Sequence, residues 1–197
     1  RFGPMTGLHA VFEFRSGPLL SCERIEKVLN RSVGILFVPE RLREVVAERH
    51  PGALVNPDTV DQGESLLVNG RWAGVVFADE VTGLVPGQAL VQGDGQVVAA
   101  CLKHDQAQAF VRSGFSTLPD KTATMRLTQR ALVEKPWHVL DELPKNLLAD
   151  LSTNGLPTFR AEDHSGVTTF GEHPIRVGRG VQVMPSVVID AVYGPVV

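Results

Sequence analysis

Three residues near the start of the chain have types suited to holding a phosphate group. Thr6, Arg15 and Gly17 lie in a stretch that leads into a helical pattern opening at Ser21. A guanidinium, exposed main-chain N–H groups and the positive end of a helix dipole all favour an anion. We therefore expect a phosphate site here, with Arg15 as its cation. The alternative for Arg15 is an ion pair with a surface carboxylate.

A second candidate site follows an apolar stretch, Ser65 to Val68, that is typical of a buried strand. Asn69 and Gly70 come directly after it. Ligands in open α/β sheets bind outside the carboxyl ends of the strands, so this position suits a ligand. Asn-Gly is also a common turn pair, and a plain turn is the alternative.

Several other chemistries are not indicated. The histidines show no spacing typical of a metal site on a helix, so we predict no metal held by protein side chains. The chain contains no Walker-type loop, no dinucleotide-binding glycine fingerprint and no Gly-x-Ser-x-Gly elbow. Asp79 and Glu80 form a carboxylate pair near a predicted strand end, and we interpret them as a solvated helix start.

The first three-quarters of the chain must position these residues, and its pattern indicates how. Short aliphatic runs alternate with helical patterns, which is typical of βαβ units and a mainly parallel sheet. Gly93-Asp94-Gly95 is a hairpin signal between two strands. We predict helices at 20–30, from 39, at 79–84 and at 105–113, and strands at 33–38, 53–56, 65–70, 88–92 and 96–102.

Residues 136–152 have a helical pattern with leucines on one side. Pro144 lies in its middle, and the proline ring clashes with the preceding turn of a helix. We therefore expect two short helices there. The leucines on one side of this pattern are Leu140, Leu143, Leu147, Leu148 and Leu151.

The last two dozen residues form three consecutive blocks of six. Each block opens with a branched aliphatic residue, namely Ile175, Val181 or Val187. This rhythm is typical of a hexapeptide β-solenoid, in which every sixth side chain points inward. The alternative is a chance period in a tail rich in valine and glycine. We expect the domain boundaries 1–152, 153–174 as a connector, and 175–197 as the truncated start of the solenoid.

Composition narrows the functional classes. The net charge of -3 and the pI near 6.1 argue against nucleic-acid binding, since no basic surplus is available to neutralise phosphates along a duplex. No apolar run reaches the ~20 residues of a membrane span. Cys22 and Cys101 suggest no disulfide framework, and we expect reduced thiols in a cytoplasmic protein. Arg1 is not an initiator Met, so we expect residues upstream of it.

The motifs together resemble those of the bacterial sugar nucleotidyltransferases related to the bifunctional N-acetylglucosamine-1-phosphate uridyltransferase. The resemblance spans nearly all of the chain. It is carried by Pro4-Met5-Thr6, Arg15, Gly17 and Ser21 with Glu23-Arg24, by Leu66-Leu67-Val68-Asn69-Gly70, by Pro136-Trp137-His138-Val139, and by the tail from Val177-Gly178 to Gly194-Pro195-Val196.

This resemblance implies a fold and a reaction. The fold would be α/β, a Rossmann-like open sheet of the nucleotide-diphospho-sugar transferase type, with the first coil of a left-handed β-helix at the C-terminus. The reaction would join an NTP to a sugar 1-phosphate with release of pyrophosphate. Arg15 would be the catalytic residue that holds phosphates, and Mg²⁺ would be bound through the substrate phosphates. The substrate-binding residues would be Thr6, Arg15, Gly17, Asn69 and Gly70. A homo-oligomer would form through the missing remainder of the solenoid.

Three departures from the family pattern leave alternatives open. The chain lacks the glycine-rich loop whose Arg and Lys hold the triphosphate in well-characterised members. Asn69 stands where those enzymes place a Mg²⁺-binding Asp, and the central strand expected before Arg1 is not in the sequence. The second hypothesis is therefore a catalytically degenerate nucleotide- or sugar-binding scaffold domain for a downstream hexapeptide acyltransferase. The third is an unrelated α/β domain.

Overall fold

The computed structural model describes residues 6–73, 76–153, 157–178 and 180–196. The motif residues Pro4 and Met5, and Arg179 and Val197 of the tail, lie outside this set. The chain divides into two compact units, Arg1–Asn146 and Leu147–Val197, and the boundary between them falls inside the helix α5.

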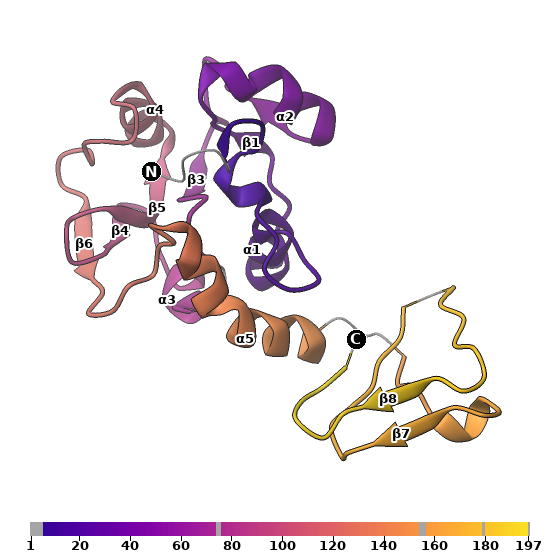
Figure 1. Ribbon diagram of the computed structural model, residues 1–197. Helices are drawn as coiled ribbons and strands as arrows, with labels where there is room; N and C mark the ends of the chain where they lie inside the picture. Colours follow the sequence, from indigo (N-terminus) through magenta and orange to yellow (C-terminus); the bar gives the residue numbers. More distant parts are fainter. Residues whose placement is uncertain (1–5, 74–75, 154–156, 179, 197) are drawn as a thin grey trace. The chain divides into compact units, whose positions relative to one another are not determined.

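The first unit contains most of the secondary structure (Figure 1). Its elements in chain order are η2 (Val11–Glu13), α1 (Ser21–Leu29), β1 (Ile35–Leu36), η3 (Glu40–Leu42), α2 (Arg43–Arg49), β2 (Leu54–Val55), β3 (Glu64–Val68), α3 (Ala78–Thr82), β4 (Gln88–Val91), β5 (Val97–Lys103), α4 (His104–Arg112), β6 (Ala123–Arg126) and the start of α5 (Pro136–Thr153).

A four-stranded sheet of order β3-β5-β4-β6 lies at the centre of this unit. Strands β3 and β4 are both antiparallel to β5, and only β6 is parallel to its neighbour β4. The expectation of a mainly parallel sheet was therefore wrong here. The reason is the turn through Gly95, whose φ of +86° suits glycine, because so short a connection can join only antiparallel strands. The strand β6 was not predicted.

A separate two-stranded sheet joins β1 and β2 in parallel. The helical segment η3–α2 connects the two strands, as expected of a βαβ unit, and it follows Pro39. Leu42 and Val46 bury the inner face of this connection. The predicted strand at 33–38 is confirmed only over its two central residues.

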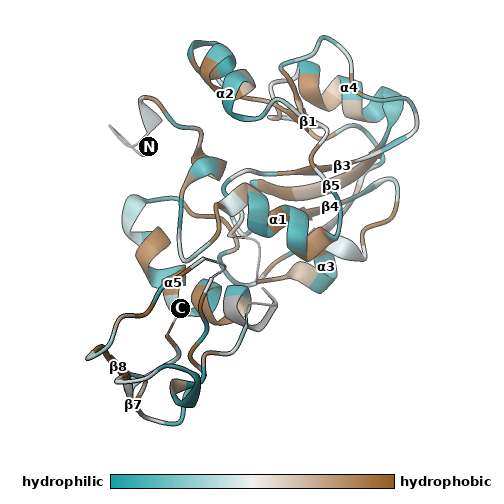
Figure 2. Ribbon diagram, turned by 90° about the vertical axis from the view of Figure 1, so that its right-hand side faces the viewer, coloured by the Kyte–Doolittle hydropathy of each residue, from teal (hydrophilic) through white to brown (hydrophobic). Residues whose placement is uncertain are grey.

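Two apolar layers enclose the four-stranded sheet. On one face Ile25 of α1 and Val81 of α3 pack with Leu90 and Val98, and on the other Phe110 of α4 packs with its own set of strand residues. Figure 2 shows α4 on one side of the sheet and α1 with α3 on the other. The first unit is thus a mixed α/β structure with small open sheets. We expected an α/β open sheet, and this coarser description is what the structure supports.

Helix α5 runs through Pro144 without a break, so the expectation of two short helices was wrong. Pro144 has no amide N–H, so the Leu140 carbonyl lacks its usual hydrogen-bond donor within the helix. Both residues are exposed, and water can reach that carbonyl oxygen instead. Of the leucines on one side of this helix, Leu140 is 68% exposed and Leu148 is 58% exposed. None of the helices among the described residues combines the length and apolar character needed to cross a membrane.

The second unit contains η4 (Ala161–Asp163), β7 (Thr168–Phe170) and β8 (Val188–Asp190), and β7 and β8 pair in parallel. Gly171, at the end of β7, comes so close to the backbone of Ala191 that a Cβ at this position would overlap the Ala191 carbonyl group. Only glycine fits this approach.

The apolar cluster of the second unit tests the predicted six-residue period. Ile175 is buried, but Val181 is 54% exposed and Val187 is only partly buried, so the predicted phase was wrong. The cluster instead contains Val177, Val183 and Ile189. The spacing of six is therefore kept, but each of these inward positions comes two residues later than predicted. A left-handed β-helix is not established by one parallel strand pair and stays a prediction.

Candidate functional site

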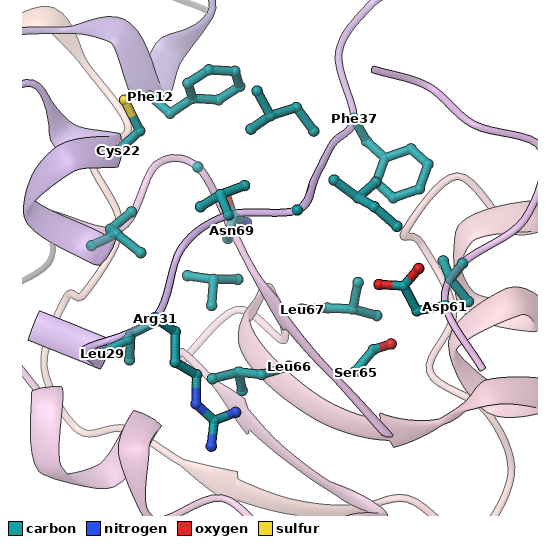
Figure 3. A pocket seen from close by; sticks show the side chains of 18 of the residues that line it. Phe12, Cys22, Leu29, Arg31, Phe37, Asp61, Ser65, Leu66, Leu67 and Asn69 are labelled. Carbon is teal, nitrogen blue, oxygen red and sulfur yellow. The ribbon is translucent and has the colours of Figure 1, made fainter. Parts of the chain in front are cut away.

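A cavity of about 490 Å³ lies in the first unit, bordered by η2, α1, β1 and β3 (Figure 3). Its walls are mostly apolar. Figure 3 shows Phe12 and Cys22 at one end and Asp61 and Ser65 at the other. The apolar side chains that line it are Phe12, Cys22, Ile25, Leu29, Val33, Ile35, Leu36, Phe37, Val60, Leu66, Leu67, Val68, Val97, Phe110 and Phe115.

Asn69 and Gly70, two of the predicted site residues, line this cavity at the carboxyl end of β3. The Asn69 side chain is tied to the backbone on both sides. Its Nδ2 donates to the carbonyl of Val97 at 2.9 Å, and its Oδ1 accepts from the amide of Arg71 at 3.1 Å. The carbonyl of Asn69 also accepts from the amide of Trp72 at 2.8 Å. Asn69 therefore closes the turn after β3 and anchors it to the start of β5.

Arg15 and Gly17 lie in a loop that does not line the cavity. Arg15 is exposed and forms an isolated antiparallel bridge with Leu20. Its guanidinium donates to the carbonyl of Pro18, so the side chain folds back on its own loop. Gly17 has a φ of +101°, a left-handed conformation that explains the glycine. The structure thus gives Arg15 a partner in the backbone rather than in a surface carboxylate.

The N-terminus of α1 was expected to attract a phosphate, and it already carries a negative charge. A carboxylate oxygen of Glu23 accepts from the amide of Leu20 at 2.7 Å, and the amide of Ser21 donates to the carbonyl of Phe14 at 2.9 Å. The Ser21 hydroxyl also donates to that carbonyl, at 3.0 Å, instead of capping the helix. Two of the amides expected at this anion site are therefore already satisfied, and a carboxylate occupies its entrance.

Thr6 lies in a different part of the first unit. Its carbonyl and that of Gly7 accept from the guanidinium of Arg41, at 2.9 and 3.0 Å. Arg49 holds the next turn through the carbonyl of Leu8 at 2.9 Å. Two arginines of the η3–α2 segment thus fix the backbone on either side of Gly7, and Thr6 does not line the cavity.

A second cavity, of about 10 Å³, links the two predicted segments through residues that the sequence analysis missed. Ser16, between Arg15 and Gly17, lines it together with Gly70 and Arg71. Asn146 of α5 closes this space by donating to the Ser16 hydroxyl at 2.7 Å. The loop around Ser16 and the turn at Gly70 are therefore neighbours. Arg71 could have been found from the sequence, because it is a cation next to Asn69-Gly70.

The residues of this region do not form a Mg²⁺ site of their own. Mg²⁺ prefers carboxylate and water oxygens. Among the described residues of the turn after β3, the side-chain oxygen on offer is that of the Asn69 amide, which already accepts a hydrogen bond. Within the described parts of the chain, no three His, Cys, Asp or Glu side chains are grouped to hold a metal ion. The expectation that Mg²⁺ is bound through the substrate phosphates stays a prediction.

Comparison with known proteins gives one result for this chain. The family model described as sugar nucleotidyl transferase matches residues 1–155, which is most of the chain and includes every described element of the first unit. No curated protein and no solved structure matches it.

Proposed function

Because this chain belongs to the sugar nucleotidyl transferase family, we propose that it transfers a nucleotidyl group from an NTP to a sugar 1-phosphate. The family match over residues 1–155 carries this proposal. The placement of Asn69 and Gly70 at the carboxyl end of a strand and beside a cavity is compatible with it.

The reaction needs positioning more than a nucleophilic side chain. An oxygen of the sugar phosphate attacks the α-phosphorus of the NTP and forms a new P–O bond. The bond between the α-phosphorus and the bridging oxygen breaks, and pyrophosphate leaves with that electron pair. The protein therefore has to align two anionic substrates and offset their charge. Mg²⁺, when bound to the phosphates, supplies part of that charge.

Arg15 is the proposed phosphate-holding residue. It is exposed, and one of its N–H groups binds the carbonyl of Pro18, which leaves a guanidinium with further donors in a fixed position. Main-chain groups at Gly17, Asn69 and Gly70 would shape the nucleotide and sugar pocket. Arg71, which lines the small cavity with Gly70, adds a second positive charge near this turn. Thr6 would act only through the backbone that Arg41 holds.

A second function, a nucleotide- or sugar-binding scaffold without turnover, is favoured by one specific observation. Both polar atoms of the Asn69 side chain bind backbone groups, so the residue that takes the place of the metal-binding Asp serves a turn. A domain of this kind would bind its ligand without releasing pyrophosphate. Assembly into a homo-oligomer through a longer solenoid belongs to the same proposal.

The decisive experiment is a pyrophosphate-release assay. UTP, dTTP, ATP and GTP would each be offered with a panel of sugar 1-phosphates and Mg²⁺. Release with one nucleotide–sugar pair, lost in Arg15→Ala but kept in Arg43→Ala, would support the transferase. Arg43 is a matched control because it is exposed and, within the part of the chain that the structure describes, forms its ion pair with Glu40, three residues away. Thermal stabilisation by a nucleotide or sugar phosphate without any release would instead favour the scaffold.

A further inference from the structure

Ser16 is the buried anchor of the loop that carries Arg15. Ser16 is buried, whereas Arg15 before it is exposed and Gly17 after it is partly buried. Arg24 of α1, which is itself fully buried, donates to the Ser16 carbonyl at 2.6 Å. Asn146 of α5, 130 residues further along the chain, donates to the Ser16 hydroxyl at 2.7 Å. Two helices therefore hold this one residue, and the position of Arg15 depends on it.

Helix α5 places three polar side chains on its inward face, which is unusual for a helix at a surface. His138, Glu142 and Asn146 follow one another at a spacing of four residues, so they lie on the same face. His138 and Asn146 are buried, and the Glu142 side chain is only 13% exposed. The apolar Trp137 and Leu140 are exposed instead. Burial of apolar surface therefore does not explain these three inward positions.

Two oxygen atoms on this inward face have no hydrogen-bond donor among the described residues. They are Oδ1 of Asn146 and Oε2 of Glu142, and both atoms are buried. The Glu142 oxygen lies 3.7 Å from Nζ of Lys145, which is an ion pair but too long for a hydrogen bond. A buried acceptor without a donor lowers stability, and an apolar side chain of similar shape would avoid that cost. Stability alone therefore does not explain Asn146.

The small cavity shows what the inward face of α5 lies against. Asn146 and Glu142 line this cavity together with Ser16 of the loop and with Gly70 and Arg71 of the turn after β3. The cavity measures about 10 Å³, so the space between these groups is about that of one water molecule. The loop and the turn, which together carry the proposed substrate-binding residues, therefore meet where α5 holds Ser16.

We propose that Asn146 is a positioning residue for nucleotidyl transfer, an inference that rests on the function proposed above. Asn146 holds the Ser16 hydroxyl and thereby fixes Arg15, whose guanidinium would bind the substrate phosphates. It also fixes the distance of this loop from the turn at Gly70. Asn146 acts through Ser16 and does not need to touch a substrate. An arginine on an anchored loop loses less conformational entropy when it binds phosphate, so the hydrogen bond between Asn146 and Ser16 strengthens that binding.

Asn146→Leu and Ser16→Ala each remove this hydrogen bond from one end. Leucine has the branched shape of asparagine and no oxygen to leave without a donor, so Asn146→Leu should keep the urea midpoint of the parent chain. Isothermal titration calorimetry with UTP, dTTP, ATP and GTP and Mg²⁺ measures binding. We expect the Kd of the nucleotide that binds to rise about tenfold in either variant. In an Arg15→Ala background, Asn146→Leu should have no further effect.

A control variant and a measurement without ligand separate this role from general stability. Gln108→Ala is the matched control, because Gln108 is a buried amide on α4 that also holds a loop, through the amide of Val60 at 3.0 Å and the carbonyl of Asp58 at 2.8 Å. It should lower the urea midpoint without changing nucleotide affinity. In the ligand-free chain, the NMR order parameter of the Ser16 amide should fall from about 0.85 toward about 0.6 in Asn146→Leu, and it should not change in Gln108→Ala.

The outcomes distinguish this inference from the proposed function. The inference is overturned if the Ser16 order parameter is unchanged in Asn146→Leu, if Gln108→Ala weakens nucleotide binding as much, or if Asn146→Leu weakens it equally in the absence of Arg15. A parent chain that binds none of the four nucleotides and releases no pyrophosphate would instead refute the proposed function. The order parameter needs no ligand, so in that case a fall would still support Asn146 as the residue that holds the loop, and an unchanged value would still overturn it.

Discussion

The backbone of Gly70 packs directly against the ring of Phe12. A Cβ built on Gly70 would lie 3.1 Å from Cδ1 of Phe12 and 3.3 Å from its Cβ. Gly70 is not among the residues with a left-handed backbone, so this glycine is explained by the close approach of η2 and not by the turn itself. The contact joins the N-terminal segment to the end of β3.

Replacing Gly70 by Ala is therefore expected to destabilise the first unit. The new methyl group would crowd the Phe12 ring, and overpacking of this kind costs about 1–3 kcal/mol. Urea denaturation measures the loss. In a Phe12→Ala background, where Cδ1 and Cγ are gone, Gly70→Ala should cost clearly less. Equal costs in the two backgrounds would show that the Phe12 contact is not the cause.

The Cys22 thiol should make stability depend on pH in the alkaline range. Burial is the largest cause that raises its pKa from 9.0 to about 11, and the charges of Glu23 and Glu26 add to the effect. Between these two values the unfolded chain loses the proton while the folded chain keeps it, so the free energy of unfolding falls as pH rises. The expected loss is on the order of 2 kcal/mol between pH 9 and pH 11.

Urea denaturation of the parent chain and of Cys22→Ala at pH 8, 9, 10 and 11 checks this. In the variant, the free energy of unfolding should fall less steeply with pH, because the contribution of Cys22 is gone. The smaller contribution of Cys101, whose pKa is also raised by burial, should remain. Parallel curves for the two proteins would contradict the prediction.

His138 should make the free energy of unfolding depend on pH in the acidic range, with the opposite sign to Cys22. Burial, and then the positive charge of Arg130, lower the pKa of this histidine from 6.5, and its Nδ1 accepts the amide of Glu134 at 3.2 Å. Below pH 6.5 the unfolded chain binds a proton that the folded chain resists, so stability falls as pH falls. His138→Asn keeps an acceptor without the titration and should flatten the curve between pH 7 and pH 5. A curve as steep for the variant as for the parent chain would contradict this prediction.

Pro144 offers a test of how α5 tolerates a proline. Pro144→Ala restores an amide that can donate to the Leu140 carbonyl, and alanine is about 3 kcal/mol better than proline inside a helix. Part of this gain is offset because proline also restricts the unfolded chain, so we expect a net gain of about 2 kcal/mol. Circular dichroism during thermal unfolding measures it. The neighbouring exposed Lys145→Ala is the control and should change stability by less than about 0.5 kcal/mol.

Local signals in the sequence predicted much of the fold. The exit of α1 at Asn30, which has a φ of +49°, and the hairpin turn at Gly95 follow from residues that favour left-handed backbone. The strand β6 was missed because Ala123–Arg126 is exposed throughout and shows no apolar alternation. The pairing of β3 with β5 was missed because it depends on contacts far apart in the sequence.

The candidate site was less accessible to sequence reasoning. Asn69 and Gly70 could be placed at a strand end because an apolar run precedes them directly. The loop around Arg15 is held by two hydrogen bonds, one from the Arg15 guanidinium to the Pro18 carbonyl and one from the Leu20 amide to the Glu23 carboxylate. The residue types in this stretch do not indicate in advance which groups will pair. The strand expected before Arg1 stays a prediction.

The parallel pairing of β7 with β8 limits which residues the tail accepts. Gly171 touches Ala191, and Thr168, Thr169 and Phe170 are in register with Val188, Ile189 and Asp190. A one-residue slip of this pairing would turn inward side chains outward and bring a bulkier residue into the space that only glycine fits. Related sequences should therefore keep glycine opposite Ala191, whereas an extra residue at Gly93–Gly95 would merely enlarge a surface loop.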